Sequence, residues 1–247
     1  MGGMNIVVSS ILAVILSYLI GSLPSAYLVG RLVKGIDIRK TGTGNMGAMN
    51  VFYKVGFWPG MLVGTMDAGK GALAVWVGTL ICQLTTPPSL VLLIVQMLCG
   101  ISAIMGHNWP AYLGFKRGGR GGATVVGILF FMVPLGIPFY ILFLVLVLAI
   151  TRFPTISYVA AMLVFPILSW AQGFTGLDAW IQQTWPALAW TRTRGTDAIE
   201  HILLIIYPFI IMTIPVMLYI PRIKEIFGRA GRNLKRAIFR GDIKENL

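Results

Sequence analysis

Long apolar segments alternate with short polar or basic ones along the whole chain. The apolar positions show no two-residue alternation, and segments of roughly 17 to 25 residues have the length of a helix that crosses a bilayer. Backbone polar groups inside hydrocarbon must be paired within the protein, which favours helices. We therefore predict single spans at about residues 6–28, 57–81, 90–104 with an extension to Trp109, 156–170 and 202–220.

Residues 123–150 form one apolar stretch that is too long for a single span. Pro134, Gly136 and Pro138 lie near its middle, and proline interrupts helical hydrogen bonding. We predict a hairpin of two short spans there, which brings the total to seven. The chain is thus predicted to be an all-α integral membrane protein, with one polytopic domain over residues 1–247.

The polar segments complete this organisation. Residues 172–200 carry Trp180, Trp185 and Trp190, and tryptophan favours the membrane interface, so this segment is expected to lie along the outer surface. Residues 222–247 are predicted to form a basic cytoplasmic tail. No basic residue precedes the first apolar segment, which is therefore expected to be a retained helix and not a signal peptide.

Composition agrees with a membrane protein. Hydrophobic residues make up 57% of the chain and charged residues only 11%, whereas a soluble domain carries about a quarter. The net charge is +12. In this setting the charge indicates cytoplasmic loops and an anionic partner, not nucleic acid.

The distribution of basic residues predicts the orientation. With the N-terminus outside and seven spans, 17 of the 20 lysines and arginines fall in cytoplasmic loops or the tail. Arg192 and Arg194 fall outside, and Lys70 lies within a span. The positive-inside rule therefore places the C-terminus in the cytoplasm.

A glycine-rich loop on the cytoplasmic side is the first candidate for chemistry. Gly42, Gly44 and Gly47 allow close approach of the backbone to an anion, and Asn45 adds an amide donor. Arg39 and Lys40 precede this loop. Short glycine patterns are weak signals, so a plain turn between two helices is the alternative.

A second loop on the same side runs from His107 to Thr124 and contains cations among glycines. Its candidate residues are His107, Asn108, Lys116, Arg117, Gly118, Gly119, Arg120, Gly121 and Gly122. Two such loops on one face can enclose a phosphorylated substrate. For His107 the alternative is an interfacial histidine bonded to the backbone.

Asp67 and Lys70 lie three residues apart within a predicted span, on one helix face. Charges inside a membrane face a cavity or a partner. A functional role and a structural ion pair between helices are both compatible with this spacing. The structural role is our prediction.

Two further groups carry polar side chains at predicted cytoplasmic positions. Arg152, Thr155, Ser157 and Tyr158 stand at the start of the sixth span, where hydroxyls can bind phosphate or cap the helix. Asn233 and Asp242 lie in the tail, which can also simply rest on anionic lipid. Cys82 and Cys99 have no metal-ligand spacing and are expected to be buried hydrophobes.

Several motifs together resemble the bacterial acyl-phosphate:glycerol-3-phosphate acyltransferases, over nearly the whole chain. In order, these motifs are GSLPSAYLVGRLVKGIDIR from Gly21, GTGNMGAMNV from Gly42, Asp67 with Lys70-Gly71, GHNWP from Gly106, GGRGGAT from Gly118, and Arg152. Their order and spacing agree with the family.

The resemblance implies a fold, a reaction and a set of site residues. It implies seven membrane helices, and transfer of an acyl group from acyl phosphate to the 1-hydroxyl of glycerol 3-phosphate, without a metal, a cofactor or an acyl-enzyme. A monomer facing membrane lipids is expected. Catalytic roles are implied for Thr43, Arg120, Ser157 and Asn233, substrate or phosphate binding for Gly42, Gly44, Asn45, Gly47, Asn50, His107, Gly118, Gly119 and Arg152, and a structural role for Asp242.

The chain also departs from the family pattern at motif positions. Thr43 replaces a serine, Tyr53 replaces an arginine, and the family sequence FKGGKGVAT reads FKRGGRGGAT from Phe115, with one inserted residue. Ser157 and Tyr158 stand for a serine pair. In the tail, Ala230 occupies a histidine position, and Asp242 stands where the family has glutamate.

These departures leave two alternatives to the family reaction. One is a divergent member of the family that acylates another phosphorylated alcohol or has weak activity. The other is a transporter of an organic phosphate. Transporters often contain repeated halves with a site near the midplane, whereas this chain shows no internal repeat and its polar motifs gather toward one face.

Overall fold

The computed structural model shows a helical bundle, and describes residues 5–133, 136–152, 154–164, 167, 198–200, 202–218 and 220. No strand occurs within these ranges, which agrees with the all-α prediction. The labelled α-helices are α1 (Ile6–Gly21), α2 (Ser25–Lys34), α3 (Ala48–Lys54), α4 (Phe57–Gln83), α5 (Ser89–Asn108), α6 (Gly122–Met132), α7 (Gly136–Thr151) and α8 (Pro154–Met162). Two 3-10 turns, η1 (Ile38–Lys40) and η2 (Ala111–Leu113), lie in the loops, and a further helix spans Ala198–Leu218.

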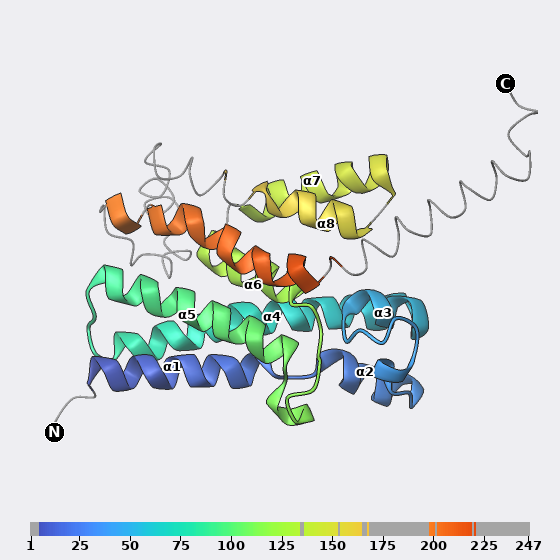
Figure 1. The fold of residues 1–247 in the computed structure, drawn as a ribbon, viewed down its shortest axis with the longest axis horizontal. Helices are drawn as coiled ribbons and strands as arrows, with labels where there is room; N and C mark the ends of the chain where they lie inside the picture. The colour runs from blue at the N-terminus through green and yellow to red at the C-terminus, as the bar shows by residue number, and fades with distance from the viewer. Residues whose placement is uncertain are drawn as a thin grey trace, which may run out of the picture.

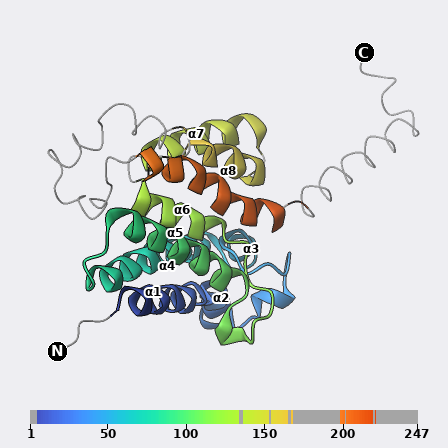
Figure 2. The same cartoon turned by 60° about the vertical axis from the view of Figure 1, so that its left-hand side comes forward.

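The helices lie in layers (Figure 1). α1, α4 and α5 pack against one another, and α6 packs on α4. The helix Ala198–Leu218 and the α7–α8 hairpin lie on the far side of α6 from α1 in both views (Figure 2). The short helices α2 and α3 continue the bundle at one end, where α3 packs on α4.

Several of these helices have the length and the apolar composition of membrane-spanning helices. Within the described part of the chain, three segments are long and apolar enough to cross a bilayer: Ile6–Lys34, Ser89–Leu113 and Ala198–Leu218. The predicted hairpin over residues 123–150 is present as two shorter apolar helices, α6 and α7. Residues 172–197 and the tail 222–247 lie outside the described residues, so the predictions for them stay predictions.

The first predicted span differs from the structure. The sequence predicted one helix over residues 6–28, whereas α1 ends at Gly21 and α2 begins at Ser25. Pro24 provides the physical reason, because proline lacks an amide hydrogen and disfavours helix in the residue before it. The break turns the chain toward the polar loops before Lys34.

Glycines allow the helices to approach closely. A Cβ atom on Gly21 of α1 would collide with Ala103 of α5, and one on Gly106 of α5 would collide with the Tyr18 carbonyl of α1. The pair α4 and α6 shows the same reciprocity, through Gly71 against Thr124 and Gly127 against the Ala68 carbonyl. Small residues at contacts are how membrane helices gain van der Waals packing.

We expect Gly127→Ala to destabilise the α4–α6 contact, because the added Cβ meets a backbone carbonyl that cannot rotate away. Overpacking of this kind costs about 1–3 kcal/mol. Thermal unfolding of the purified protein in detergent should show a lower midpoint. Gly69→Ala is the matched control, because nothing lies within 4 Å of its Cβ position; an equal midpoint for the two variants would contradict the packing role.

Candidate active site

The two predicted polar loops meet in one open cleft of about 520 Å³. Residues from both loops, separated by more than seventy positions in the chain, line it. They are Asp37, Arg39, Lys40, Thr43, Gly44, Asn45, Lys116, Arg117, Gly118 and Arg120. Five of these ten residues are cationic and one is acidic. The cleft therefore favours an anion with several oxygens.

Asn50 organises the first loop from beneath. Its side-chain amide donates hydrogen bonds to three backbone carbonyls, those of Ile38, Thr41 and Asn45, at 3.0–3.1 Å. Its Oδ1 accepts from the Thr43 amide at 3.1 Å. The side chain is buried, and these bonds use its polar atoms. These bonds show that Asn50 shapes the loop, and its predicted contact with substrate stays a prediction.

The glycines of this loop are required by conformation and by space. Gly42 and Gly44 have φ values of +59° and +68°, in the left-handed region that glycine adopts without strain. A Cβ atom on Gly42 would also collide with Asn50 Oδ1. Gly47 precedes α3 and lies close to the Asn45 side chain. The loop thus presents Thr43, Gly44 and Asn45 to the cleft.

Arg39 and Asp37 form a two-pronged ion pair at the rim of the cleft. The Arg39 Nε and Nη2 atoms donate to the two carboxylate oxygens of Asp37 at 3.0 and 2.8 Å. The guanidinium also lies 4.9 Å from the centre of the Tyr27 ring. Hydrogen bonding from Arg39 lowers the pKa of the Asp37 carboxyl to about 2. The sequence reasoning missed Asp37, although an acid two positions before an arginine was a visible signal.

The second loop is attached to the end of α5. The amide of Gly118 donates to the Asn108 carbonyl at 2.7 Å, and that of Gly119 donates to the His107 carbonyl at 3.2 Å. Phosphate binding by Gly118 and Gly119 stays a prediction, although these two amides are engaged within the fold. The loop also brings the side chains of Lys116, Arg117 and Arg120 to the cleft.

Gly119 is the point where the two loops touch. A Cβ atom there would collide with the His107 ring and lie 2.6 Å from the Met46 carbonyl of the first loop. Its neighbour Gly118 would collide with the His107 carbonyl. A side chain at either position would push the loops apart, so these glycines hold the cleft together.

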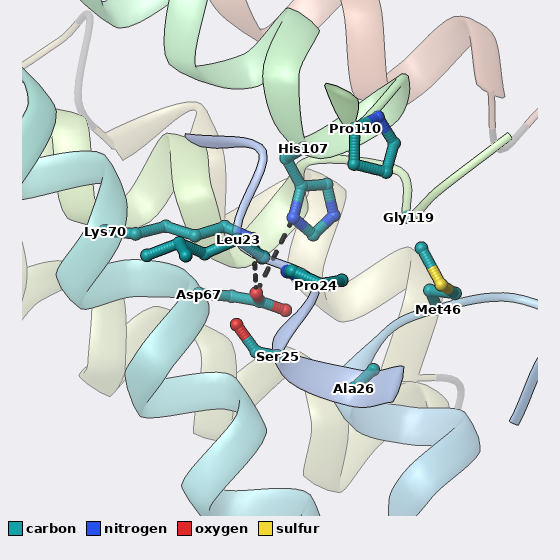
Figure 3. Close-up of a pocket in the computed structure, with 10 residues that line it drawn as sticks. All are labelled: Leu23, Pro24, Ser25, Ala26, Met46, Asp67, Lys70, His107, Pro110 and Gly119. Atoms are coloured by element: carbon teal, nitrogen blue, oxygen red, sulfur yellow. Dashed lines mark hydrogen bonds and ion pairs between the residues drawn. The ribbon is translucent and has the colours of Figure 1, made fainter. Parts of the chain in front are cut away.

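A buried polar cluster lines a second, smaller cavity (Figure 3). Asp67 Oδ1 forms an ion pair with Lys70 Nζ at 2.8 Å. The same oxygen lies 3.6 Å from His107 Nδ1. Lys70 Nζ also donates to the Leu23 carbonyl at 2.7 Å, in the break between α1 and α2. A cavity of about 10 Å³ beside the cluster has room for roughly one water molecule.

His107 belongs to this cluster. Its ring is buried and points toward Asp67 and Lys70 (Figure 3), and its predicted contact with phosphate stays a prediction. It lines the small cavity and not the open cleft. The predicted structural pair of Asp67 and Lys70 is formed, and both side chains are only 4% exposed.

Two other predicted site residues lie away from the cleft lining. Ser157 is fully buried, and its hydroxyl lies 3.1 Å from the Thr151 hydroxyl, across the turn between α7 and α8. Arg152 is exposed in that turn with a φ of +55°. Asn233, Asp242 and Ala230 lie outside the described residues. The fold and the cleft together define a helical membrane protein with a cationic site suited to phosphate groups.

Comparison with known proteins narrows this class. The glycerol-3-phosphate acyltransferase family profile matches residues 11–227. The chain therefore belongs to the glycerol-3-phosphate acyltransferase family. Glycerol-3-phosphate acyltransferase 2 of Dehalococcoides mccartyi is 44% identical over 245 residues, covering 99% of this chain and 100% of the relative. The glycerol-3-phosphate acyltransferase of Synechococcus sp. (strain CC9902) is 37% identical over 196 residues, which cover 79% of this chain and 92% of the relative.

A solved structure shows the same fold. The crystal structure of PlsY (YgiH), an integral membrane glycerol 3-phosphate acyltransferase in its glycerol 3-phosphate form, aligns with a TM-score of 0.65. The alignment covers 90% of this chain and 94% of that chain, at 22% identity. The predicted family resemblance is thus confirmed, and this chain is a multi-pass membrane protein with an acyltransferase fold.

We expect Asp67→Leu and Lys70→Met, each alone, to destabilise the protein strongly. Either change leaves one buried charge without its partner, and breaking a buried pair in this way costs about 3–5 kcal/mol. The double variant should be the more stable, because no buried charge remains. Thermal unfolding in detergent tests the order. Folded single variants without activity would instead indicate a direct chemical role for the pair.

Proposed function

We propose that this protein transfers a fatty acyl group from acyl phosphate to the 1-hydroxyl of glycerol 3-phosphate, giving lysophosphatidic acid and inorganic phosphate. The observation that carries the proposal is the convergence of two basic loops on one cleft in a member of this family. Both substrates carry a phosphate group, and the acyl donor and product also need access to lipid. The open cationic cleft meets the first need, and the second is part of the proposal.

The chemistry fits what the cleft offers. The hydroxyl oxygen attacks the acyl carbonyl carbon, the bond from that carbon to the phosphate oxygen breaks, and the hydroxyl proton passes to the departing phosphate. Acyl phosphate is already activated, so the protein mainly positions two anions and offsets their repulsion. The cations of the cleft supply that electrostatic stabilisation.

The residues of the cleft divide into two groups. Lys40, Lys116, Arg117 and Arg120 supply positive charge, and arginine presents paired donors that suit phosphate oxygens. Thr43 and Asn45 add a hydroxyl and an amide. Ser157 and Arg152 do not line this cleft. Their roles, like the catalytic role of Asn233, stay predictions from the family motif.

The membrane arrangement that we propose has seven spans with the cleft on the cytoplasmic side. α1, α4, α5, α6, α7, α8 and the helix Ala198–Leu218 supply these spans. Under this arrangement 17 of the 20 lysines and arginines lie on the cytoplasmic side, as the positive-inside rule favours. The remaining proposals are a monomer in the cell membrane, an outer interfacial segment at residues 172–200 and a cytoplasmic tail.

The proposal predicts that purified protein in lipid converts palmitoyl phosphate and glycerol 3-phosphate into equal amounts of lysophosphatidic acid and phosphate. Both products are followed in the same reaction. Folded protein that forms neither product would contradict the proposal. Uptake of labelled glycerol 3-phosphate into sealed vesicles, without lipid product, would indicate a transporter instead.

Gly44→Leu should raise the KM for glycerol 3-phosphate by at least about tenfold, because a Cβ at a φ of +68° strains the loop and lies 3.1 Å from the Arg39 carbonyl. Gly69→Leu is the matched control, on an exposed helix face with nothing within 4 Å of its Cβ position. Equal KM values for the two folded variants would remove this loop from the site.

A further inference from the structure

The loop that carries Arg120 is held at both of its ends. At the first end, the amides of Gly118 and Gly119 donate to carbonyls at the end of α5. At the second end, the Tyr158 hydroxyl of α8 donates to the Gly122 carbonyl at 2.8 Å. Arg120 lies between these anchors and lines the cleft.

Tyr158 also occupies the space that a side chain at position 122 would need. A Cβ atom on Gly122 would lie 3.0 Å from both Cζ and Oη of Tyr158 and 3.4 Å from its Cε1. The backbone itself does not demand glycine there, because Gly122 is absent from the positive-φ positions, which include its neighbour Gly121 at +80°. The contact with the tyrosine ring is therefore the local reason for a glycine at position 122.

Tyr158 and Gly122 lie 36 positions apart in the chain and in direct contact in the fold. The large side chain at one position therefore matches the missing side chain at the other.

We infer that Tyr158 and Gly122 form a complementary pair through which α8 positions Arg120 for the phosphate group in the cleft. Tyr158 itself does not line the cleft, so it acts through the loop as a positioning residue. The ring packed against Gly122, with its hydroxyl bonded to the Gly122 carbonyl, holds the start of α6, two residues after Arg120. This inference rests on the proposed function for the identity of the phosphate substrate.

Four variants of the full-length protein in lipid test the pair. Gly122→Val alone should raise the KM for glycerol 3-phosphate about tenfold, because the branched side chain collides with the ring. Tyr158→Ala alone should raise it by a similar factor, because the ring that packs against position 122 is lost and leaves a cavity there. The double variant should return to within about threefold of the original value, because valine fills the space left by the ring; such non-additivity is the signature of contacting residues. Tyr158→Phe, which keeps the ring, should show only a small increase.

Controls separate positioning from folding and from the reaction itself. Tyr112→Phe, at an exposed site in η2, should leave the KM unchanged. Binding of glycerol 3-phosphate by calorimetry should follow the same order as the KM values, and it remains measurable if the proposed reaction does not occur. A double variant no better than the worse single variant would overturn the pairing. If Gly122→Val fails to fold, unchanged binding in folded Tyr158→Ala would overturn it equally.

Discussion

The buried ion pair between Asp67 and Lys70 is the interaction on which the site end of the molecule depends. Lys70 donates both to Asp67 and to the Leu23 carbonyl, which lies in the break between α1 and α2. The same carbonyl also accepts from the Ser25 amide at 3.0 Å, so Lys70 supplies a second, charged donor to the break. Because Asp67 also faces His107, the pair connects three separate segments at one point. The position of α2, and of the loop that follows it, is set from there.

A series of contacts connects this cluster to the two loops that form the cleft. His107 and Asn108 accept hydrogen bonds from the second loop, and Gly119 in that loop touches the first loop at Met46. Asn50 then shapes the first loop by saturating its carbonyls. Backbone groups thus serve mainly to hold the two loops, while side-chain cations face the substrate. This arrangement keeps the charged groups preorganised, which is what electrostatic catalysis requires.

Much of the fold was predictable because membrane insertion constrains the sequence directly. Apolar length, proline positions and the charge bias of the loops predicted an all-helical protein and the hairpin at residues 123–150, which the structure shows as α6 and α7. The order of the motifs predicted the family, which the family profile confirms. The break after Gly21 was missed, although Pro24 marked it, because apolar residues continue on both sides.

The sequence by itself determined the membrane class, the family and the two loops that supply cations, because these depend on composition and on motifs that lie within short stretches. Only the tertiary structure decided which polar groups face the cleft. His107 and Asn50 carry chemistry that suits phosphate, yet both side chains are buried: His107 faces Asp67, and Asn50 is hydrogen-bonded to the first loop. Tyr158 gained its role through a contact between two helices, with a residue 36 positions away in the chain. Such orientation depends on how the helices pack, which no local pattern encodes.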